Sequence, residues 1–295
     1  LQVQIIMQGS IDRAVVVTGA STGIGRAAVA KAVREGAHVF ASVRKQVDAD
    51  SLTKEFGEAV TPLIFDVADE AAVRAGAAQV EQALGKRKLF GLVNNAGIAV
   101  AGPLLHLDTD ELKRQFEINL FGVHNVTRAF ANALGADPDR GGKPGRIVMI
   151  SSVGGQNGAP FVGPYAASKF ALEGYSQSLR RELMLYGIDV IVIGPGAIAT
   201  PIWDKAEQED LNRFSNTAYA PMLKRVADYM LSQGKVGLPA SDVGDLIWLC
   251  LTDPKPKTRY HILRKPFMDR TLPRLMNPRT VDGIIAKRLG FPKRP

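Results

Sequence analysis

Short runs rich in valine and isoleucine recur along this chain and alternate with segments whose apolar residues repeat every three or four positions. The second pattern, typical of one face of a helix, is shown by Leu112, Phe116, Leu120 and Val123. Strands that alternate with helices form βαβ crossovers, so the sequence predicts a doubly wound α/β fold with a parallel sheet and helices on both faces. We expect about seven strands. Six are visible, at residues 14–18, 38–42, 61–65, 89–93, 146–150 and 189–193.

The alternation continues through most of the 295 residues without an internal repeat or a low-complexity tract, which favours a single domain. A composition of 46% hydrophobic and 22% charged residues excludes disordered and collagen-like proteins. We expect an N-terminal extension over residues 1–11, the α/β domain over 12–262 and a C-terminal extension over 263–295. The single cysteine, Cys250, permits no internal disulfide, and no apolar run approaches the ~20 residues of a spanning helix, so we predict a cytoplasmic location.

The formal net charge of +8 is concentrated near the C-terminus. Between Lys255 and Pro295 there are twelve Lys or Arg and two Asp, which leaves the preceding 254 residues with a net charge of −2. A near-neutral body argues against nucleic-acid binding. Apolar residues at helical spacing predict two short amphipathic helices in this basic tail, separated by Asn277-Pro278.

A glycine-rich turn follows the first expected strand and precedes a helical pattern that begins at Arg26. The turn has the sequence Thr18-Gly19-Ala20-Ser21-Thr22-Gly23-Ile24-Gly25. Its three glycines permit a tight turn, close approach of a pyrophosphate and close packing of the helix, whose first N–H groups are free to bind phosphate. A strand before the turn and a helix after it favour a dinucleotide site of the Rossmann type over a turn without a ligand.

Tyr165 and Lys169 stand four residues apart in a helical pattern and therefore share a face. A neighbouring ammonium favours the phenolate and lowers the pKa of a tyrosine from ~10, which makes the phenol usable as a general acid or base. Ser152 precedes Tyr165 by 13 residues and ends the fifth expected strand. Asn119 lies within an earlier helical pattern.

In order and spacing, these motifs resemble those of the short-chain dehydrogenase/reductase family, and the resemblance spans residues 12–262. Asp66-Val67 ends the third strand, where the family binds near the adenine ring. Asn94-Asn95-Ala96-Gly97 ends the fourth, where the family steadies the sheet and lines the adenosine ribose. Pro195-Gly196, followed by Ile198 and Thr200, matches the segment that holds the nicotinamide carboxamide. The chain looks most like the hydroxysteroid- and retinol-dehydrogenase side of the family.

The resemblance implies roles for four catalytic residues, with no metal. Tyr165 would exchange a proton with the substrate oxygen, and Ser152 would hydrogen-bond that oxygen. Lys169 would lower the pKa of Tyr165 and bind the nicotinamide ribose, while Asn119 would anchor a water that links Lys169 to solvent. Hydride would pass directly between the nicotinamide and the carbon that carries the oxygen. The residues expected to bind the cofactor are Thr18, Gly19, Ser21, Thr22, Gly23, Ile24, Gly25, Arg44, Asp66, Val67, Asn95, Ala96, Gly97, Tyr165, Lys169, Pro195, Gly196, Ile198 and Thr200.

The residue that selects between NAD and NADP is expected ~20 residues after the glycine motif, at the end of the second strand. Val43 stands there instead of an acidic residue, and Arg44 with Lys45 offers positive charge to a ribose 2′-phosphate. We predict a preference for NADP(H). NAD(H) remains the alternative, in which both cations are solvated loop charges.

The expected substrate-facing residues are mostly apolar and include no arginine to bind a carboxylate: Ser152, Val153, Phe161, Tyr165 and Trp203. Met222 and Tyr229 belong to an expected lid over residues 201–238. This lining favours a bulky, weakly polar alcohol or ketone, such as a steroid or retinoid. The alternatives are an enzyme for a small carbonyl compound and a non-catalytic dinucleotide sensor on the same fold.

Three roles are open for the basic tail: contact with an anionic membrane surface, a cap over the substrate cleft, and packing against the body or a neighbouring subunit. The first would add peripheral membrane association to the predicted cytoplasmic location. The resemblance also implies a homodimer or homotetramer, paired through the helices expected at 110–134 and 165–186.

Overall fold

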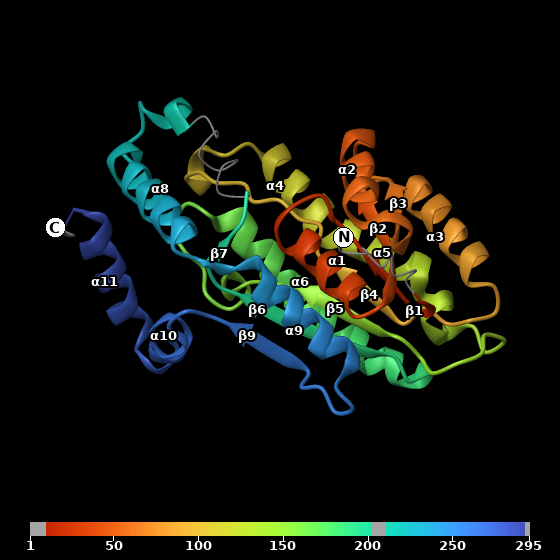
Figure 1. Ribbon diagram of the computed structural model, residues 1–295. Coiled ribbons are helices and arrows are strands. Elements are labelled where there is room, and N and C mark those ends of the chain that lie inside the picture. Colours follow the sequence, from red (N-terminus) through yellow and green to blue (C-terminus); the bar gives the residue numbers. More distant parts are fainter. Residues whose placement is uncertain (1–9, 202–210, 293–295) are drawn as a thin grey trace, which may run out of the picture.

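A seven-stranded parallel sheet forms the centre of the computed structural model, which describes residues 10–201 and 211–292 (Figure 1). The strand order is β3-β2-β1-β4-β5-β6-β9, and every neighbouring pair is parallel. The strands are β1 (Ser10–Val17), β2 (Ala37–Val43), β3 (Val60–Ile64), β4 (Gly91–Asn94), β5 (Arg146–Ile150), β6 (Asp189–Pro195) and β9 (Arg259–Ile262). The predicted doubly wound parallel sheet is therefore confirmed. Its first strand begins at Ser10, inside the segment that the sequence assigns to an extension.

Helices cover both faces of the sheet, as the βαβ pattern requires (Figure 1). They are α1 (Gly23–Arg34), α2 (Gln46–Phe56), α3 (Glu70–Leu84), α4 (Thr109–Phe116), α5 (Gly122–Ala131), α6 (Gly163–Glu182), α8 (Ala220–Lys235), α9 (Ala240–Thr252), α10 (Leu272–Leu275) and α11 (Pro278–Leu289). One buried apolar cluster joins the sheet to α3, α5 and α6, and a second joins the opposite face to α1, α2 and α9. None of the helices within the described ranges combines the length and apolar content that a membrane-spanning segment needs.

A two-stranded sheet stands beside the main one and pairs β7 (Ile198–Ala199) with β8 (Leu238–Pro239). These strands flank the segment expected as a lid and hold its two ends together. A third apolar cluster, here called the lid cluster, lies over this region and consists of Phe161, Phe214, Met222, Leu223, Val226 and Leu289.

The basic tail continues from β9 into α10 and α11, with Asn277 as the N-cap of α11. The α11 helix runs alongside α8, away from α2 and α3 (Figure 1). Leu289 at its end is 8% exposed and belongs to the lid cluster. Of the three roles left open for the tail, packing against the body describes α11 in this structure.

Candidate active site

The strand order reverses between β1 and β4, and in doubly wound sheets ligands bind beyond the carboxyl ends of the strands at such a point. Thr18 joins the two strands there. Its N–H donates to the Val93 carbonyl over 3.0 Å, and its hydroxyl accepts from the N–H groups of Asn95 and Ala96 over 3.0 and 3.1 Å. The Asn95 amide donates back to the carbonyls of Thr18 and Gly19 over 2.9 and 3.1 Å. These bonds fix the glycine turn beside the loop after β4.

The glycine turn has the shape that a bound dinucleotide requires. Gly19 and Gly23 have φ angles of +64° and +58°, which favour glycine. A Cβ on Gly19 would lie 2.9 Å from Cα of Ala96, and one on Gly25 would overlap the Gly19 carbonyl and lie 2.6 Å from Nδ2 of Asn95. The first turn of α1 contains no acidic residue, and Thr22 caps it without a side-chain hydrogen bond. This N-terminus therefore suits an anionic pyrophosphate.

Gly25→Ala should weaken NADPH binding by at least about 10-fold, because the added methyl group forces the glycine turn away from Asn95 and the Gly19 carbonyl. Titration of the purified protein with NADPH, followed by fluorescence, measures the change. Gly174→Ala in α6 is the matched control, since a Cβ there meets nothing within 4 Å. Equal NADPH affinity for the two variants would contradict the role given to the glycine turn.

The expected adenosine end lies at the carboxyl ends of β2 and β3. The Ala20 N–H donates to the Ser42 carbonyl over 2.9 Å and so brings the glycine turn next to the end of β2. Arg44 follows that strand with its side chain 57% exposed, and its Nη1 lies 3.8 Å from Oδ2 of Asp66. An arginine this exposed, with one distant carboxylate partner, is accessible to a ligand phosphate.

The expected carboxamide segment reaches the same turn from the other side. A Cβ on Gly23 would lie 3.2 Å from Cβ of Thr200, so Thr200 stands over the start of α1. Ile198 is buried in β7, and the Gly196 N–H donates to the Ile262 carbonyl over 3.0 Å. The structure thus brings the glycine, adenosine and carboxamide segments to one edge of the sheet.

Ser152, Tyr165 and Lys169 meet where β5 ends and α6 begins. The Ser152 hydroxyl accepts from the Gly154 N–H over 3.0 Å. A Cβ on Gly154 would lie 3.2 Å from Cε1 of Tyr165 and 3.4 Å from Oγ of Ser152, so both side chains border this glycine. Lys169 is 5% exposed, and its Nζ donates to the Ile150 carbonyl over 2.8 Å. The same Nζ lies 5.8 Å from the centre of the Tyr165 ring. The residues that the sequence places four apart therefore do share a face of α6.

The ionisation of this pair differs from the expectation. Burial raises the pKa of Tyr165 and the neighbouring Ser152 hydroxyl lowers it, so the net shift is opposite to the predicted lowering. Burial also lowers the pKa of Lys169 to about 8, against a smaller raising effect of the Glu173 carboxylate. The helical spacing predicted that Tyr165 and Lys169 share a face, but the loss of hydration determines the direction of the pKa shift of each.

Asn119 is fully buried in η3 (Glu117–Phe121), a π-helical turn between α4 and α5. Its Oδ1 accepts from the Ile98 N–H over 2.9 Å, and its Nδ2 donates to the Ile98 carbonyl and to Oγ of Ser168 over 3.0 and 3.1 Å. These bonds connect the loop after β4 with α6, next to Lys169. The predicted water relay through Asn119 stays a prediction.

The structure places the remaining expected substrate residues in different surroundings. Val153 begins η5 (Val153–Gly155), directly after Ser152. Phe161 and Met222 are buried together in the lid cluster. Tyr229 is 41% exposed, and its ring is covered by the Arg288 guanidinium at 4.1 Å. Trp203 lies outside the described residues.

An ion pair behind Lys169 was missed by the sequence analysis. Glu173 stands one helical turn beyond Lys169 and pairs with Arg259 of β9, with side-chain exposures of 11% and 18%. Nε of Arg259 also donates to Nε2 of His261 over 3.0 Å. Burial and the neighbouring arginines 259, 270 and 274 lower the pKa of His261 to about 4, so its imidazole is neutral at pH 7. The continuation of the spacing from Tyr165 and Lys169 to Glu173 was the available signal.

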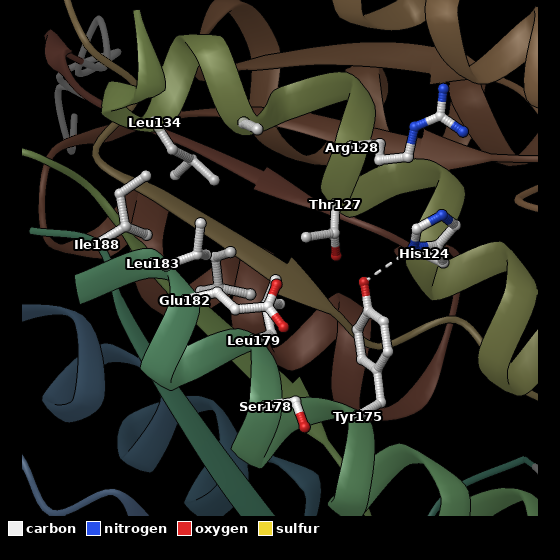
Figure 2. A pocket seen from close by; sticks show the side chains of 12 residues that line it. His124, Thr127, Arg128, Leu134, Tyr175, Ser178, Leu179, Glu182, Leu183 and Ile188 are labelled. Atoms are coloured by element: carbon white, nitrogen blue, oxygen red, sulfur yellow. Dashed lines mark hydrogen bonds between the residues drawn. The ribbon is translucent and has the colours of Figure 1, made fainter. Parts of the chain in front are cut away.

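A cavity of about 290 Å³ lies between α5 and α6 (Figure 2). Neither Ser152 nor Tyr165 lines it. Its lining is mostly apolar, with His124 and Tyr175 joined by a 3.1 Å hydrogen bond at one side. These are the helices that the family resemblance assigns to subunit pairing. The cavity therefore contains none of the four expected catalytic side chains.

Comparison with known proteins defines the class. The family model described as short chain dehydrogenase matches residues 13–211. The NADPH-dependent 3-dehydrocapnine reductase of Ornithobacterium rhinotracheale is 37% identical over 94% of this chain and 97% of its own length. The uncharacterized oxidoreductase YbbO of Escherichia coli (strain K12) is 32% identical over 95% of this chain and 97% of its own length. The crystal structure of a short-chain dehydrogenase from Streptomyces avermitilis superposes with a TM-score of 0.73 at 25% sequence identity. The match covers 93% of this chain and 95% of that structure's chain.

The chain belongs to the short-chain dehydrogenase/reductase family. It is an NAD(P)-dependent oxidoreductase of the short-chain type, as the resemblance of its motifs implied.

Proposed function

We propose that the protein is an NADPH-dependent reductase of a bulky, weakly polar ketone or aldehyde, of the steroid, retinoid or other lipophilic class. The observation that carries the proposal is the placement of Ser152 and Tyr165 on either side of Gly154 at the carboxyl end of β5, with the buried Lys169 ammonium 5.8 Å from the centre of the Tyr165 ring. A dinucleotide sensor has no use for this arrangement. The apolar surroundings of Phe161 favour a bulky substrate over a small one.

In this mechanism, Tyr165 donates its phenolic proton to the substrate oxygen and Ser152 donates a hydrogen bond to the same oxygen. The raised pKa of Tyr165 keeps the proton in place until the oxygen becomes negative. Lys169, with a pKa of about 8, is largely charged at neutral pH and stabilises the phenolate that remains. A bound nicotinamide cofactor supplies the hydride. Asn119 holds α6 against the loop after β4, so that the three side chains keep their positions.

For the cofactor, we propose the binding residues that the sequence predicts, with NADP(H) preferred through Arg44. Two observations support the preference: the exposed guanidinium beyond β2, and the NADPH dependence in the name of the Ornithobacterium rhinotracheale relative. We do not transfer the substrate of that relative to this chain. Its description as a reductase agrees with the reduction that we propose here.

Arg44→Ala should raise the KM for NADPH by about 10-fold or more and leave the KM for NADH within about twofold, because only NADPH carries the 2′-phosphate that the guanidinium would bind. Initial rates with each cofactor at saturating carbonyl substrate measure both constants. Arg34→Ala, which removes a similarly exposed arginine from α1, is the control. An equal rise for both cofactors would contradict the selectivity role.

The domain division, the lid over 201–238 and the homodimer or homotetramer remain part of this proposal, the last supported by the open apolar cavity on α5 and α6. The cytoplasmic location and membrane contact of the tail stay predictions.

Oxidation of NADPH with a panel of steroid ketones, retinal, aromatic ketones and aliphatic aldehydes tests the proposed activity. Cofactor binding without turnover, in the reduction panel and in the reverse panel of alcohols, would favour the sensor.

A further inference from the structure

Phe161 has a left-handed backbone with a φ angle of 65°, which no other non-glycine residue has among those the structure describes. It lies four residues before Tyr165, in the loop that leads into α6. Its carbonyl accepts from the Gly102 N–H over 2.7 Å, which ties this loop to the one after β4. L side chains rarely adopt this conformation, and it persists where the surroundings hold it.

Aromatic rings from two distant parts of the chain hold Phe161 in place. Phe291 of the tail stacks on it, with ring centres 6.4 Å apart and planes inclined by 7°. Tyr219, just before α8, meets it edge-on at 5.8 Å, and His106 meets Tyr219 at 5.7 Å. The Phe161 side chain, in the loop that leads to Tyr165, is therefore in contact with Phe291 of the tail and with Tyr219 of the lid.

The tail is anchored so that Phe291 reaches this position. Nη1 of Arg225, on α8, donates to the Leu289 carbonyl at the end of α11 over 3.0 Å. Gly290, with a φ angle of 70°, leaves room for this contact, because a Cβ there would lie 2.8 Å from Cζ of Arg225. The Arg288 guanidinium covers the ring of Tyr229 on the same helix.

Exposed apolar side chains lie on the turn that follows Gly102, the residue bonded to the Phe161 carbonyl. Leu104 and Leu105, on the turn η2 (Leu104–His106), are 63% and 81% exposed. A Cβ on Gly163, at the start of α6, would lie 2.7 Å from Leu104, so this turn reaches the first residues of the catalytic helix. Exposed apolar surface is thus present close to Gly163, two residues after Phe161 and two before Tyr165.

We propose that Phe291 of the basic tail, through its stack on Phe161, forms the outer wall of the substrate site and selects substrates with a large apolar group remote from the carbonyl. The inference rests on the proposed function. It assigns the tail to specificity, in addition to its packing on α8. A purely structural tail would affect all substrates alike, whereas a wall affects only those large enough to reach it.

The test compares Phe291→Ala with the wild type on two ketones: the bulkiest that the wild type reduces, and cyclohexanone. We expect kcat/KM for the bulky ketone to fall by at least about 10-fold and that for cyclohexanone to change by less than about twofold. NADPH affinity should be unchanged. Phe291→Tyr, which keeps the ring, should restore the bulky substrate. Phe267→Ala is the matched control, because that tail phenylalanine is 59% exposed and lies outside the lid cluster.

An equal fall for both ketones, or no change for either, would overturn the inference and leave the proposed reductase standing. If Phe291→Ala unfolds, Phe291→Leu keeps the apolar contact with α8 and removes only the stack, and the same comparison applies. A wild-type protein that oxidises NADPH with no ketone or aldehyde of the carbonyl panel would overturn the proposed function itself, and this inference with it.

Discussion

Tyr165→Phe should lower kcat for carbonyl reduction by about 10²–10⁴-fold, the usual contribution of a positioned general acid. The substitution removes only the phenolic hydroxyl, and the ring keeps its place on α6 beside Lys169. Lys169 and the glycine turn remain, so we expect the affinity for NADPH to fall far less than kcat does. NADPH oxidation with the best substrate of the carbonyl panel measures the loss, and a fluorescence titration measures the binding.

Tyr175→Phe is the matched control for this variant. Tyr175 lies on the same helix, but its hydroxyl bonds to His124 in the cavity between α5 and α6, away from Ser152. Its removal should leave turnover within about twofold. If Tyr165→Phe retained most of the activity, the proton would have to come from another group, and the assignment of the acid would fail. If both variants lost activity together, the effect would report on α6 as a whole.

Local sequence signals predicted the sheet and the glycine turn well. Burial of parallel strands on both faces demands continuous valine and isoleucine, as in β5 and β6, and close backbone approach demands glycine at positions such as 25. The seventh strand was harder to locate. In β9, the residues Arg259–Ile262 are all only partly buried at the sheet edge, so they mix charged, aromatic and apolar types without a clear pattern.

Features that depend on distant contacts were not accessible in this way. Glu173 and Arg259 are 86 residues apart in the sequence, and nothing near either residue indicates the partner. The direction of the Tyr165 pKa shift depends on how completely the surrounding elements exclude water, which spacing on one helix does not reveal. Phe161 likewise combines a left-handed backbone with a stack on Phe291, and Phe291 belongs to another part of the chain.

Glu173→Gln should destabilise the protein by roughly 2–3 kcal/mol, because it keeps the shape of the side chain but removes the charge that pairs with the partly buried Arg259 guanidinium. Arg270 and Arg274 act on the same neighbour, His261, so the local excess of positive charge grows. A loss of this size corresponds to a fall in Tm of roughly 5–10 °C. Thermal unfolding measures it, and Glu182→Gln, an exposed change on the same helix, is the control. The double variant Glu173→Gln/Arg259→Gln should regain part of the stability.

The same substitution should move the pH profile of reduction. Lys169 is charged below its pKa of about 8, so activity that requires its ammonium is lost as the pH rises through this value. The Glu173 carboxylate raises that pKa against the effect of burial. Without the carboxylate the pKa falls further, and the loss of kcat/KM should begin at a lower pH than in the wild type. An ion pair with a purely structural role would change Tm but not the fall of kcat/KM at high pH. If the variant is destabilised and this fall begins at the wild-type pH, Glu173 supports the fold and not the ionisation of Lys169.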